Sequence, residues 1–516
     1  MKRREFLQLS TALLASGALG AMRPAFAQTT PGMGGTIRVA MQAQPGSLDP
    51  HMTTADATAQ VARNVFEQLL ALNSGYQYAP MLAESFDQSD DGLTFTFHLR
   101  QGVKFHNGKT MTADDVIASL EKWITTNSKK TMFEVHTLAA PDDHTVVLTM
   151  AKKVYGVLEA LADNGQFAGI MPKEIVEAAD ATGVTEYIGT GPFKFAEWSR
   201  DQFVRLVRND DYQPLAGPPD GLVGDKTAHA DELIYYFVAD PSTRIAGIMT
   251  GEYDVADSLP IDYYEQVRGN ADLDILKRSL NLVAIYNKKE GLLANVAMRK
   301  AVNAALDSEA IMLAVQSFPE FFRLDPSYMY EEQANWHSTA GANQYSQNDP
   351  ELAKKYLAEA GYANEPVRIL TSKDHAHLFN SSVVIQQQLA AAGMNARLDV
   401  YDWPTTLEHR GKSSDWDITV TGFPLVLAPT QLLYLSANWA GWTDDPTIAK
   451  HIAEINASTS LDEAKAIWQA LQGYCWEDYL PVSKLGDRIA YAAYSRRLLG
   501  LASLEGGVFW SAGFAG

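Results

Sequence analysis

The sequence predicts an α/β protein of two lobes with mixed sheets, and three observations indicate it. Residues 367–423 alternate strand and helix patterns in the order β-α-β-α-β, which is typical of a parallel or mixed sheet covered by helices. Residues 140–260 read mostly as short strands and turns. The tail at 485–516 returns to short strand-like pieces and so resembles the first half. We therefore expect lobes joined by chain crossovers.

The first half contains alternating strands and two well-marked helices. Residues 93–99 place Leu and Phe side chains on one face and Thr and His98 on the other, as a half-exposed strand does. Thr112 and Asp115 begin a helix in the manner of a capping box. The elements predicted here are a strand at 36–40, helices at 59–70 and 113–123, strands at 144–150 and 203–209, and a helix that ends at Gly251 and leads into a strand.

The second half carries clearer helix boundaries. Asn295 and Asp349 are expected N-caps, the second with proline at the first helical position, and Gly361 is an expected helix stop. The elements predicted here are helices at 295–306 and 349–361, a strand at 367–372, a helix at 379–393, a strand at 396–403, a short helix at 405–411 and a strand at 416–423.

The first 27 residues have the organisation of an export signal. Three positive residues precede an apolar run at 6–21, and the small-x-small triplet Ala25-Phe26-Ala27 predicts cleavage after Ala27. The RREFL stretch at 3–7 is typical of a twin-arginine signal; an ordinary secretory signal is the alternative. No cysteine lies near the cleavage site, which excludes a lipid anchor there. We expect a soluble protein of the periplasm.

Charge and cysteine content exclude several classes of protein. The net charge is −20, and it becomes −23 when four positive residues and one negative residue leave with residues 1–27. Such an acidic protein repels phosphate backbones, so nucleic acid is not an expected partner. Cys475 is the only cysteine, so an internal disulfide and CxxC motifs are excluded.

Motifs for catalysis are missing. The sequence contains no HExxH, GxSxG, GxGxxG or Walker loop, so zinc hydrolases, α/β-hydrolases, dinucleotide enzymes and P-loop proteins lose their main support. We predict no catalytic residues, no resident metal and no cofactor. A carboxylate pair of the glycosidase type is unsupported but not excluded by sequence.

Two histidine pairs raise the question of a metal site. His98 and His106 flank a predicted hairpin, and too few ligands converge there for a metal, so a scaffold role is favoured. His375 and His377 lie in a predicted loop between a strand and a helix, where α/β lobes often contact ligands. A helix N-terminus at that loop would favour a neutral histidine or an anion over a cation.

Aromatic residues gather at predicted strand ends in the last third. Tyr401 and Trp403 are expected to end one strand, and Phe423 the next, while Trp439 and Trp442 follow in a loop. Because strand ends and the loops after them line crevices in α/β sheets, these residues are candidate ligand contacts. Packing within the core is the alternative for each.

The order of several sequence blocks resembles a known family. The chain is similar over nearly all its mature length to the family 5 extracellular solute-binding proteins, the dipeptide-, oligopeptide- and nickel-binding components of ABC importers. The blocks that carry this resemblance are GTIRVAMQAQPGSLDPH, LAESFDQSDDGLTFTFHLRQGVKFHNGKTMTADDV, IGTGPFKFAEW, RNDDY, TGEYDV and VAMRKAVNAALD.

The resemblance implies a periplasmic binding protein type II-like fold with an extra inserted domain in the N-terminal lobe. A ligand cleft lies between the lobes, and crossovers near 280 and 485 form the hinge. The implied division is lobe 1 core at 28–72, 188–280 and 485–516, an inserted domain at 73–187, and an α/β lobe 2 at 281–484.

The resemblance also implies where ligand contacts arise, on the loop after Pro50, in the inserted domain and at strand ends of lobe 2. The implied ligand-binding residues are Thr53, Thr54, Asp56, Met132, Phe133, Asn164, Gln166, Phe167, Tyr401, Trp403 and Phe423, with Trp439 and Trp442 in the stretch that follows.

The chain departs from the peptide-binding pattern after Phe423. Peptide binders of the family place an aspartate a few residues after an aromatic, where it pairs with the peptide α-ammonium. Here no acid occurs until Asp444, and the sequence after Phe423 is PLVLAP. A buried ammonium needs a paired charge, so we expect a solute that is not anchored in this way. Asp56 on the other lobe is the one candidate replacement.

The expected function is capture of a peptide-like or other small organic solute and its delivery to an inner-membrane ABC permease, without catalysis. An exported hydrolase, or a receptor that reports ligand status to a membrane sensor, are the alternatives on the same fold. Nothing in the sequence calls for an oligomer, so we expect a monomer.

Overall fold

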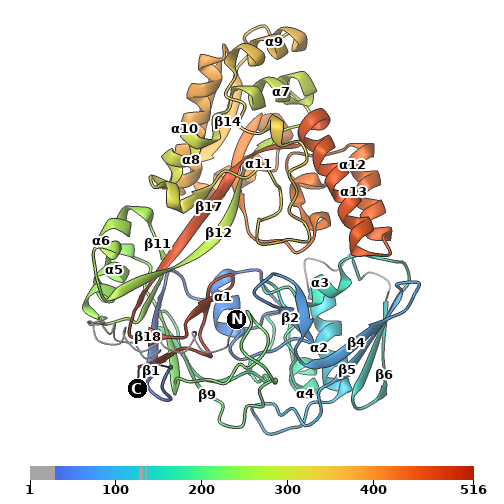
Figure 1. The fold of residues 1–516 in the computed structure, drawn as a ribbon, viewed down its shortest axis with the longest axis vertical. Helices are drawn as coiled ribbons and strands as arrows, with labels where there is room; N and C mark the ends of the chain where they lie inside the picture. The colour runs from blue at the N-terminus through green and yellow to red at the C-terminus, as the bar shows by residue number, and fades with distance from the viewer. Residues whose placement is uncertain (1–29, 127–131, 134–135, 516) are drawn as a thin grey trace, which may run out of the picture.

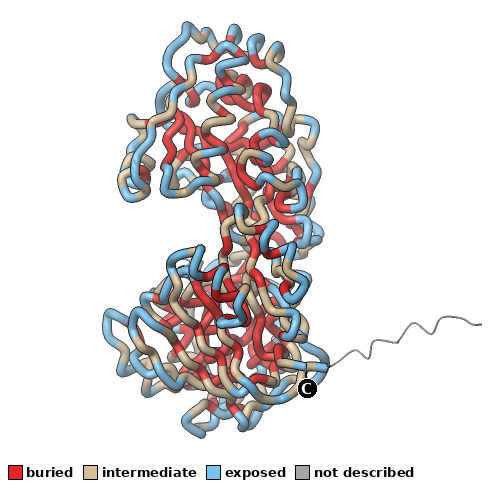
Figure 2. Tube along the Cα trace, turned by 90° about the vertical axis from the view of Figure 1, so that its left-hand side faces the viewer, coloured by how far each residue is buried: buried red, intermediate tan, exposed pale blue. Residues whose placement is uncertain are grey.

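The computed structural model describes residues 30–126, 132–133 and 136–515, which form two lobes (Figure 1). The predicted signal peptide, residues 1–27, lies outside the described residues. A narrower middle joins the lobes, and buried segments run through it (Figure 2). The lower lobe in Figure 1 contains both the blue start and the dark red end of the chain. The predicted two-lobed α/β organisation is confirmed.

One eleven-stranded sheet runs through both lobes, and its two longest strands cross between them. β12 (Leu273–Tyr286) pairs antiparallel with β17 (Val482–Ser495), and Leu280 lies opposite Arg488. Both crossovers therefore belong to one hydrogen-bonded ribbon. The strand order is β15 (Ala396–Tyr401), β14 (Val367–Ser372), β16 (Ile418–Phe423), β12, β17, β11 (Val255–Leu259), β1 (Thr36–Met41), β10 (Glu232–Phe237), β9 (Phe203–Arg208) and β8 (Phe193–Ser199), with β13 (Phe322–Arg323) paired to β17.

The lower lobe buries most of its apolar residues in a cluster drawn from both ends of the chain, and a smaller cluster packs around α5 (Pro241–Thr250) and α6 (Tyr264–Arg268). The larger cluster takes residues from 37–255 and 498–512, and Leu427 joins it from the upper lobe. In the sheet, β1 lies between parallel β10 and β11. The other elements of this lobe are α1 (Asp56–Ala62), β2 (Leu70–Leu72), β3 (Tyr78–Pro80), α5 (Pro241–Thr250), a 3-10 turn at Ile261–Tyr263, α6 (Tyr264–Arg268), β18 (Leu498–Leu499), β19 (Ala502–Ser503), β20 (Gly507–Val508) and β21 (Gly513–Phe514).

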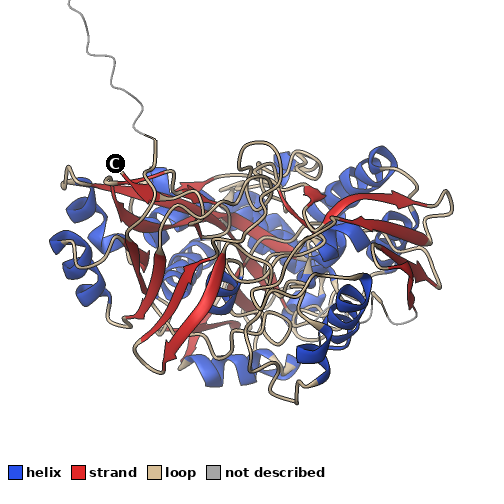
Figure 3. Ribbon diagram, turned by 90° about the horizontal axis from the view of Figure 1, so that it is seen from below, coloured by secondary structure: helices blue, strands red, loops and turns tan. Residues whose placement is uncertain are grey.

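A separate four-stranded antiparallel sheet extends the lower lobe. Seen from below, it lies to the right, apart from the strands of the large sheet at the left (Figure 3). β5 follows the predicted alternation, since Phe95 and Phe97 are buried and His98 is exposed. The sheet order is β4 (Ala83–Gln88), β5 (Thr94–Leu99), β7 (Thr145–Met150) and β6 (His136–Asp142), and the helices beside it are α2 (Ala113–Thr126), α3 (Val157–Leu161) and α4 (Lys173–Glu177).

The upper lobe packs helices around β14, β15 and β16, and its core cluster spans residues 282–485. In the described ranges, no helix is both long and apolar enough to cross a membrane. The helices are α7 (Val296–Ala305), α8 (Ser308–Gln316), α9 (Pro350–Ala360), α10 (Ala376–Ala391), α11 (Trp403–Arg410), α12 (Pro446–Ala457) and α13 (Leu461–Tyr474), with a π-helical turn at Cys475–Tyr479 and 3-10 turns at Leu292–Ala294, Pro319–Phe321, Ala342–Gln344, Ser413–Asp415, Pro429–Gln431 and Leu433–Leu435.

The predicted helix boundaries of the upper lobe are confirmed by side-chain caps. The Asn295 side chain accepts a hydrogen bond from the backbone N–H of Ala297, and Asp349 accepts one from Leu352. Gly361 ends α9 with φ of 71°, a left-handed conformation that favours glycine.

Two predicted elements differ from the structure. The helix expected at 59–70 is α1, which ends at Ala62, because the Asn64 side chain donates to the Gln60 and Val61 carbonyls and competes with further helical bonds. The strand expected to end at Trp403 ends at Tyr401, because Asp402 accepts from the Thr405 N–H and caps α11.

His106 belongs to the scaffold rather than to a cleft. Its Nε2 donates to the Gly191 carbonyl at 2.9 Å, and its backbone N–H donates to the Gly189 carbonyl at 2.9 Å. Burial lowers the pKa of His106 to about 4, so the ring is neutral at physiological pH. This residue ties the inserted sheet to the segment that leads into β8.

The change His106→Ala is expected to lower the free energy of unfolding by about 2 kcal/mol, because buried backbone groups lose their partners. His98→Ala is the matched control; it removes an exposed hydrogen bond with Asp87 and should cost less than about 1 kcal/mol. Urea unfolding of both variants measures this. Equal costs, or loss of ligand binding in either variant, would contradict the scaffold role.

Candidate ligand site between the lobes

Three adjoining cavities lie between the lobes beside the β12–β17 ribbon. The largest has a volume of about 530 Å³, and the others have volumes of about 310 and 230 Å³. The first two share Asp56 and Arg278, and the first and third share Arg488, His375 and His377. Residues of both lobes and both crossover strands thus line one cleft, whose volume suits a small organic molecule.

Arg278 on β12 organises the lower wall of this cleft. Its guanidinium lies 3.0 Å from Asp56 Oδ1, and its Nε donates to Glu505 Oε2 at 3.0 Å. Burial alone lowers the pKa of Arg278, but the two carboxylates outweigh it and raise the pKa above its ordinary value. Burial raises the pKa of Glu505. The Asp56 carboxylate is therefore already paired with a cation.

Asp257 on β11 adds a further carboxyl to the lower wall. It accepts hydrogen bonds from Gln60 Nε2 at 3.2 Å and from Ser258 Oγ at 3.1 Å. Burial first, and then the charge of Asp56, raise the pKa of Asp257. This carboxyl therefore takes up a proton more readily than an exposed aspartate.

Arg488 on β17 lies at the middle of the cleft. It lines the 530 and 230 Å³ cavities and a neighbouring one of about 240 Å³ that extends toward α8. Within the described residues, its guanidinium has no hydrogen-bond or ion-pair partner. Burial, with the nearby charge of Arg278, lowers the pKa of Arg488 to about 10. It therefore stays charged at neutral pH.

The two histidines at the start of α10 form the upper wall. His375 is the N-cap residue, and its ring meets the Trp403 ring edge-on with centroids 4.5 Å apart. Burial, then the charges of Arg488 and His375, lower the pKa of His377 to about 3. His377 is therefore neutral at physiological pH.

Only part of the predicted aromatic set reaches the cavities. Trp403 and Phe423 line the 230 Å³ cavity. Trp439 packs behind Phe423 with ring centroids 5.4 Å apart, and Trp442 packs on the Trp416 ring at 5.8 Å. Tyr401 is 39% exposed and stacks on His409. Trp403 and Phe423 are thus the aromatic residues placed to touch a solute in this conformation.

The predicted residues of the lower lobe divide in the same way. Thr54, Asp56, Asn164 and Gln166 line the 310 Å³ cavity. The remaining predictions lie elsewhere in the lobe: Thr53 accepts from the Ala55 N–H, Met132 is half-buried against the lobe core, Phe133 is buried against Trp123, and Phe167 is buried in the same core.

Several residues of the cleft escaped sequence reasoning. Arg278, Arg488 and Asp257 come from strands, and their alignment opposite α10 depends on the pairing of β11, β12 and β17. The available signal was a charged residue inside an apolar strand pattern, as in LDILKRSLNLVAIY. Such residues are seldom buried without a partner or a role.

The segment after Phe423, where the anchoring acid is missing, contacts the lower lobe. Leu427 is buried in the lower-lobe core cluster, and Leu425 packs against it. Leu425 and Pro424 also line the 310 Å³ cavity. Residues that make apolar contacts between the lobes therefore follow Phe423, where the family resemblance implies an aspartate in peptide binders.

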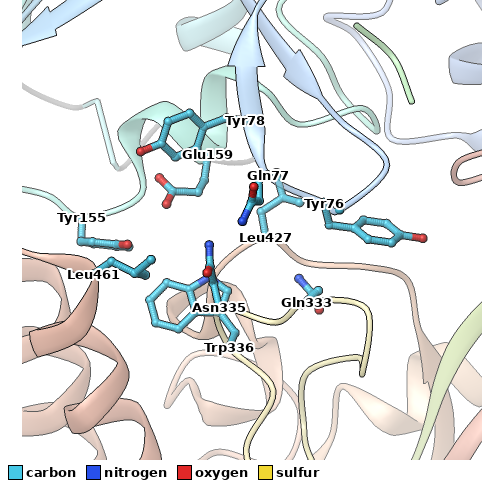
Figure 4. A pocket seen from close by; sticks show the side chains of 11 residues that line it. Tyr76, Gln77, Tyr78, Tyr155, Glu159, Gln333, Asn335, Trp336, Leu427 and Leu461 are labelled. Atoms are coloured by element: carbon cyan, nitrogen blue, oxygen red, sulfur yellow. The ribbon is translucent and has the colours of Figure 1, made fainter. Parts of the chain in front are cut away.

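A separate pocket of about 230 Å³ lies between α3 and a loop of the upper lobe. Figure 4 shows Glu159 and Tyr78 facing Asn335 and Trp336 across it. The Tyr155 and Trp336 rings meet edge-on with centroids 5.6 Å apart, so the lobes touch here. Burial raises the pKa of Glu159 to about 7.

Metal ligands do not cluster in the part of the chain that the structure describes: no group of three or more His, Cys, Asp or Glu side chains is arranged to hold an ion.

The cleft and its shared strands agree with comparisons to known proteins. The model of bacterial extracellular solute-binding proteins, family 5, matches residues 77–444. The chain belongs to this family. It is therefore the solute-binding component of an ABC importer and a non-catalytic transport protein, which removes the hydrolase alternative.

The alignments with individual relatives cover almost the whole chain. A probable peptide ABC transporter periplasmic-binding protein, y4tO, of Sinorhizobium fredii is 30% identical, with 97% of each chain covered. The AgaA protein of A. tumefaciens R10, solved with agropinic acid, is 25% identical with a TM-score of 0.72, covering 92% of this chain and 97% of that one. CtaP of Listeria monocytogenes shares the fold, with 21% identity, a TM-score of 0.81, and 94% and 100% covered.

The pKa of Glu159 predicts a pH dependence of stability. A folded-state pKa of about 7, above the ordinary 4.5, means that the folded protein binds more protons than the unfolded chain between these values. Stability should therefore fall as pH rises through 7. Between pH 5.5 and pH 8.5, the wild type should lose on the order of 1–2 kcal/mol of unfolding free energy that Glu159→Gln does not lose.

Urea unfolding of the wild type and the variant at both pH values measures the effect. The control is Glu177→Gln, which changes an exposed carboxyl on α4. If Glu159→Gln and Glu177→Gln give the same pH dependence, Glu159 is not protonated in the folded protein.

Proposed function

We propose that this solute-binding protein captures a peptide-like or other small organic solute in the interlobe cleft and delivers it to an inner-membrane ABC permease. The observation that carries the proposal is that the cavities are walled by both lobes and by β12 and β17 together. A movement of the lobes about this ribbon, near residues 280 and 485, would open and close the cleft on its solute.

The proposal includes the route and the setting. The RREFL signal sends the chain through the twin-arginine pathway, cleavage follows Ala27, and the monomeric mature protein works in the periplasm. The periplasmic naming of the S. fredii relative supports this location. The domain division proposed is 28–72, 188–280 and 485–516 for the core of lobe 1, 73–187 for the insertion, and 281–484 for lobe 2.

The solute in this proposal is not held by an aspartate paired with an α-ammonium. Asp56, the one candidate for that role, already pairs with Arg278 and accepts from Gln60. An ammonium would have to compete with the Arg278 guanidinium for the oxygens of this exposed carboxylate. The S. fredii relative is named for peptides, and AgaA was solved with agropinic acid; both support a small organic solute here.

A signalling role, in which this importer component also reports ligand status to a membrane sensor, would use the same cleft and add a second partner. The genes beside this one discriminate the two: a permease pair and an ATPase indicate import, and a sensor kinase indicates signalling.

Native mass spectrometry of the mature protein from its own periplasm tests the proposal. We expect a bound small molecule that denaturation releases. Trp403→Ala and Phe423→Ala should each raise the dissociation constant of that released solute at least about tenfold, because each aromatic ring lines the cleft.

Calorimetric titration of the released solute into each variant measures the change. Phe203→Ala is the control, since this ring packs on Tyr236 on the far strands β9 and β10. Unchanged affinity in both cleft variants, with the fold intact, would place the solute elsewhere.

A further inference from the structure

Among the described residues, Arg488 is the one guanidinium of the cleft without a hydrogen-bond or ion-pair partner. Arg278, on the neighbouring strand, contacts two carboxylates. Other arginines are similarly satisfied: the buried Arg244 and Arg299 donate to backbone carbonyls, and the half-buried Arg323 pairs with Glu332 and Asp487. Among the described residues, nothing of this kind reaches Arg488.

Arg488 is half-buried, and a cation that is partly removed from water without a partner costs free energy that the fold must supply. Arg488 cannot avoid this cost by losing its proton, because its pKa of about 10 keeps it charged at neutral pH. Its position is also not peripheral, since three cavities meet at its side chain. An anionic group placed in the cleft would supply the missing partner.

We infer that the solute carries a carboxylate and that Arg488 binds it in the interlobe cleft. The inference rests on the proposed function and names the class of solute. A guanidinium presents parallel N–H groups that match the two oxygens of a carboxylate. The pair would form only when solute fills the cavity, so it contributes to binding and not to the stability of the empty protein.

The start of α10 adds to this preference for an anion. No described residue accepts a hydrogen bond from the backbone N–H of Ala376 or His377, and the His375 side chain makes no capping bond. Both residues line the 530 Å³ cavity with Arg488. The free N–H groups and the positive end of the helix dipole therefore favour negative charge at the same place.

The opposite wall limits the charge of the solute. Asp56 and Asp257 line the same cavity on this side, and Glu505 lies beside Arg278. Asp374, next to His375 on the α10 side, adds a further acid to the cavity. A dianion such as a phosphate monoester would be repelled by these acids more strongly than a single carboxylate would. Asp257 and Gln60 instead offer hydrogen bonds to a polar group at the other end of the molecule. A solute with one carboxylate end and one hydrogen-bonding end fits both walls.

Mass spectrometry of the cargo tests the inference on the protein as it occurs in the periplasm. Wild type, Arg488→Gln, Arg488→Lys and a control, Arg397→Gln, are purified in parallel. Arg397 is a largely exposed arginine on β15 beside Asp399. The released solute is fragmented to identify its acidic group, and its affinity for each refolded, emptied protein is then titrated.

We expect the wild-type solute to be a carboxylic acid. Arg488→Gln should weaken its binding at least about 30-fold, Arg488→Lys should weaken it less, and Arg397→Gln should leave it unchanged. The methyl ester of the same solute should lose affinity for the wild type and bind Arg488→Gln no worse than the acid does. Equal melting temperatures of the emptied proteins confirm that the variants fold.

Three results would overturn the inference. If the released solute has no acidic group, the inference of a carboxylate is wrong, but the proposed function still holds. A released phosphate ester keeps an anion at Arg488 but contradicts the single carboxylate. If the wild type releases nothing, its melting temperature is measured with a panel of dipeptides and with their C-terminal amides. If neither set raises the melting temperature, both this inference and the proposed cleft are contradicted.

Discussion

The antiparallel pairing of β12 with β17 is the constraint on which the rest of the molecule depends. Both strands are 14 residues long, and each passes from one lobe to the other. A single crossover would let the lobes turn freely, whereas two crossovers joined by a ladder confine their movement to bending and twisting of one ribbon. The same ribbon lines the cleft, so the element about which we propose the lobes close also carries Arg278 and Arg488.

The two arginines show how one pairing gives neighbouring residues different roles. Arg278 is held by Asp56 and Glu505, which joins α1, β12 and the C-terminal segment into one wall. Arg488 lies on the partner strand and is left for something outside the chain. The apolar segment after Phe423 packs on the lower lobe and supplies no acid. The cleft therefore differs in charge from one built around an ammonium anchor, because its unsatisfied group is positive.

Local signals in the sequence were enough for much of the scaffold. Asn295, Asp349 and Gly361 set helix ends by bonds to residues within a few positions, and the alternation at 93–99 identified a half-exposed strand. The extent of α1 was not predictable from periodicity, since Asn64 turns its amide back onto the helix. The residue pattern extends the strand to Trp403, whereas the cap formed by Asp402 ends it at Tyr401.

The sequence by itself determined the family, the two-lobed α/β plan, the absence of the anchoring acid and the aromatic candidates Trp403 and Phe423, because these depend on residue order and near neighbours. Only the tertiary structure decided which candidates share a cleft, that Asp56 is already neutralised, and that Arg488 meets His377 and the start of α10. Those facts join residues more than a hundred positions apart. Strand register and burial fix such meetings, and neither is encoded in any single stretch of the chain.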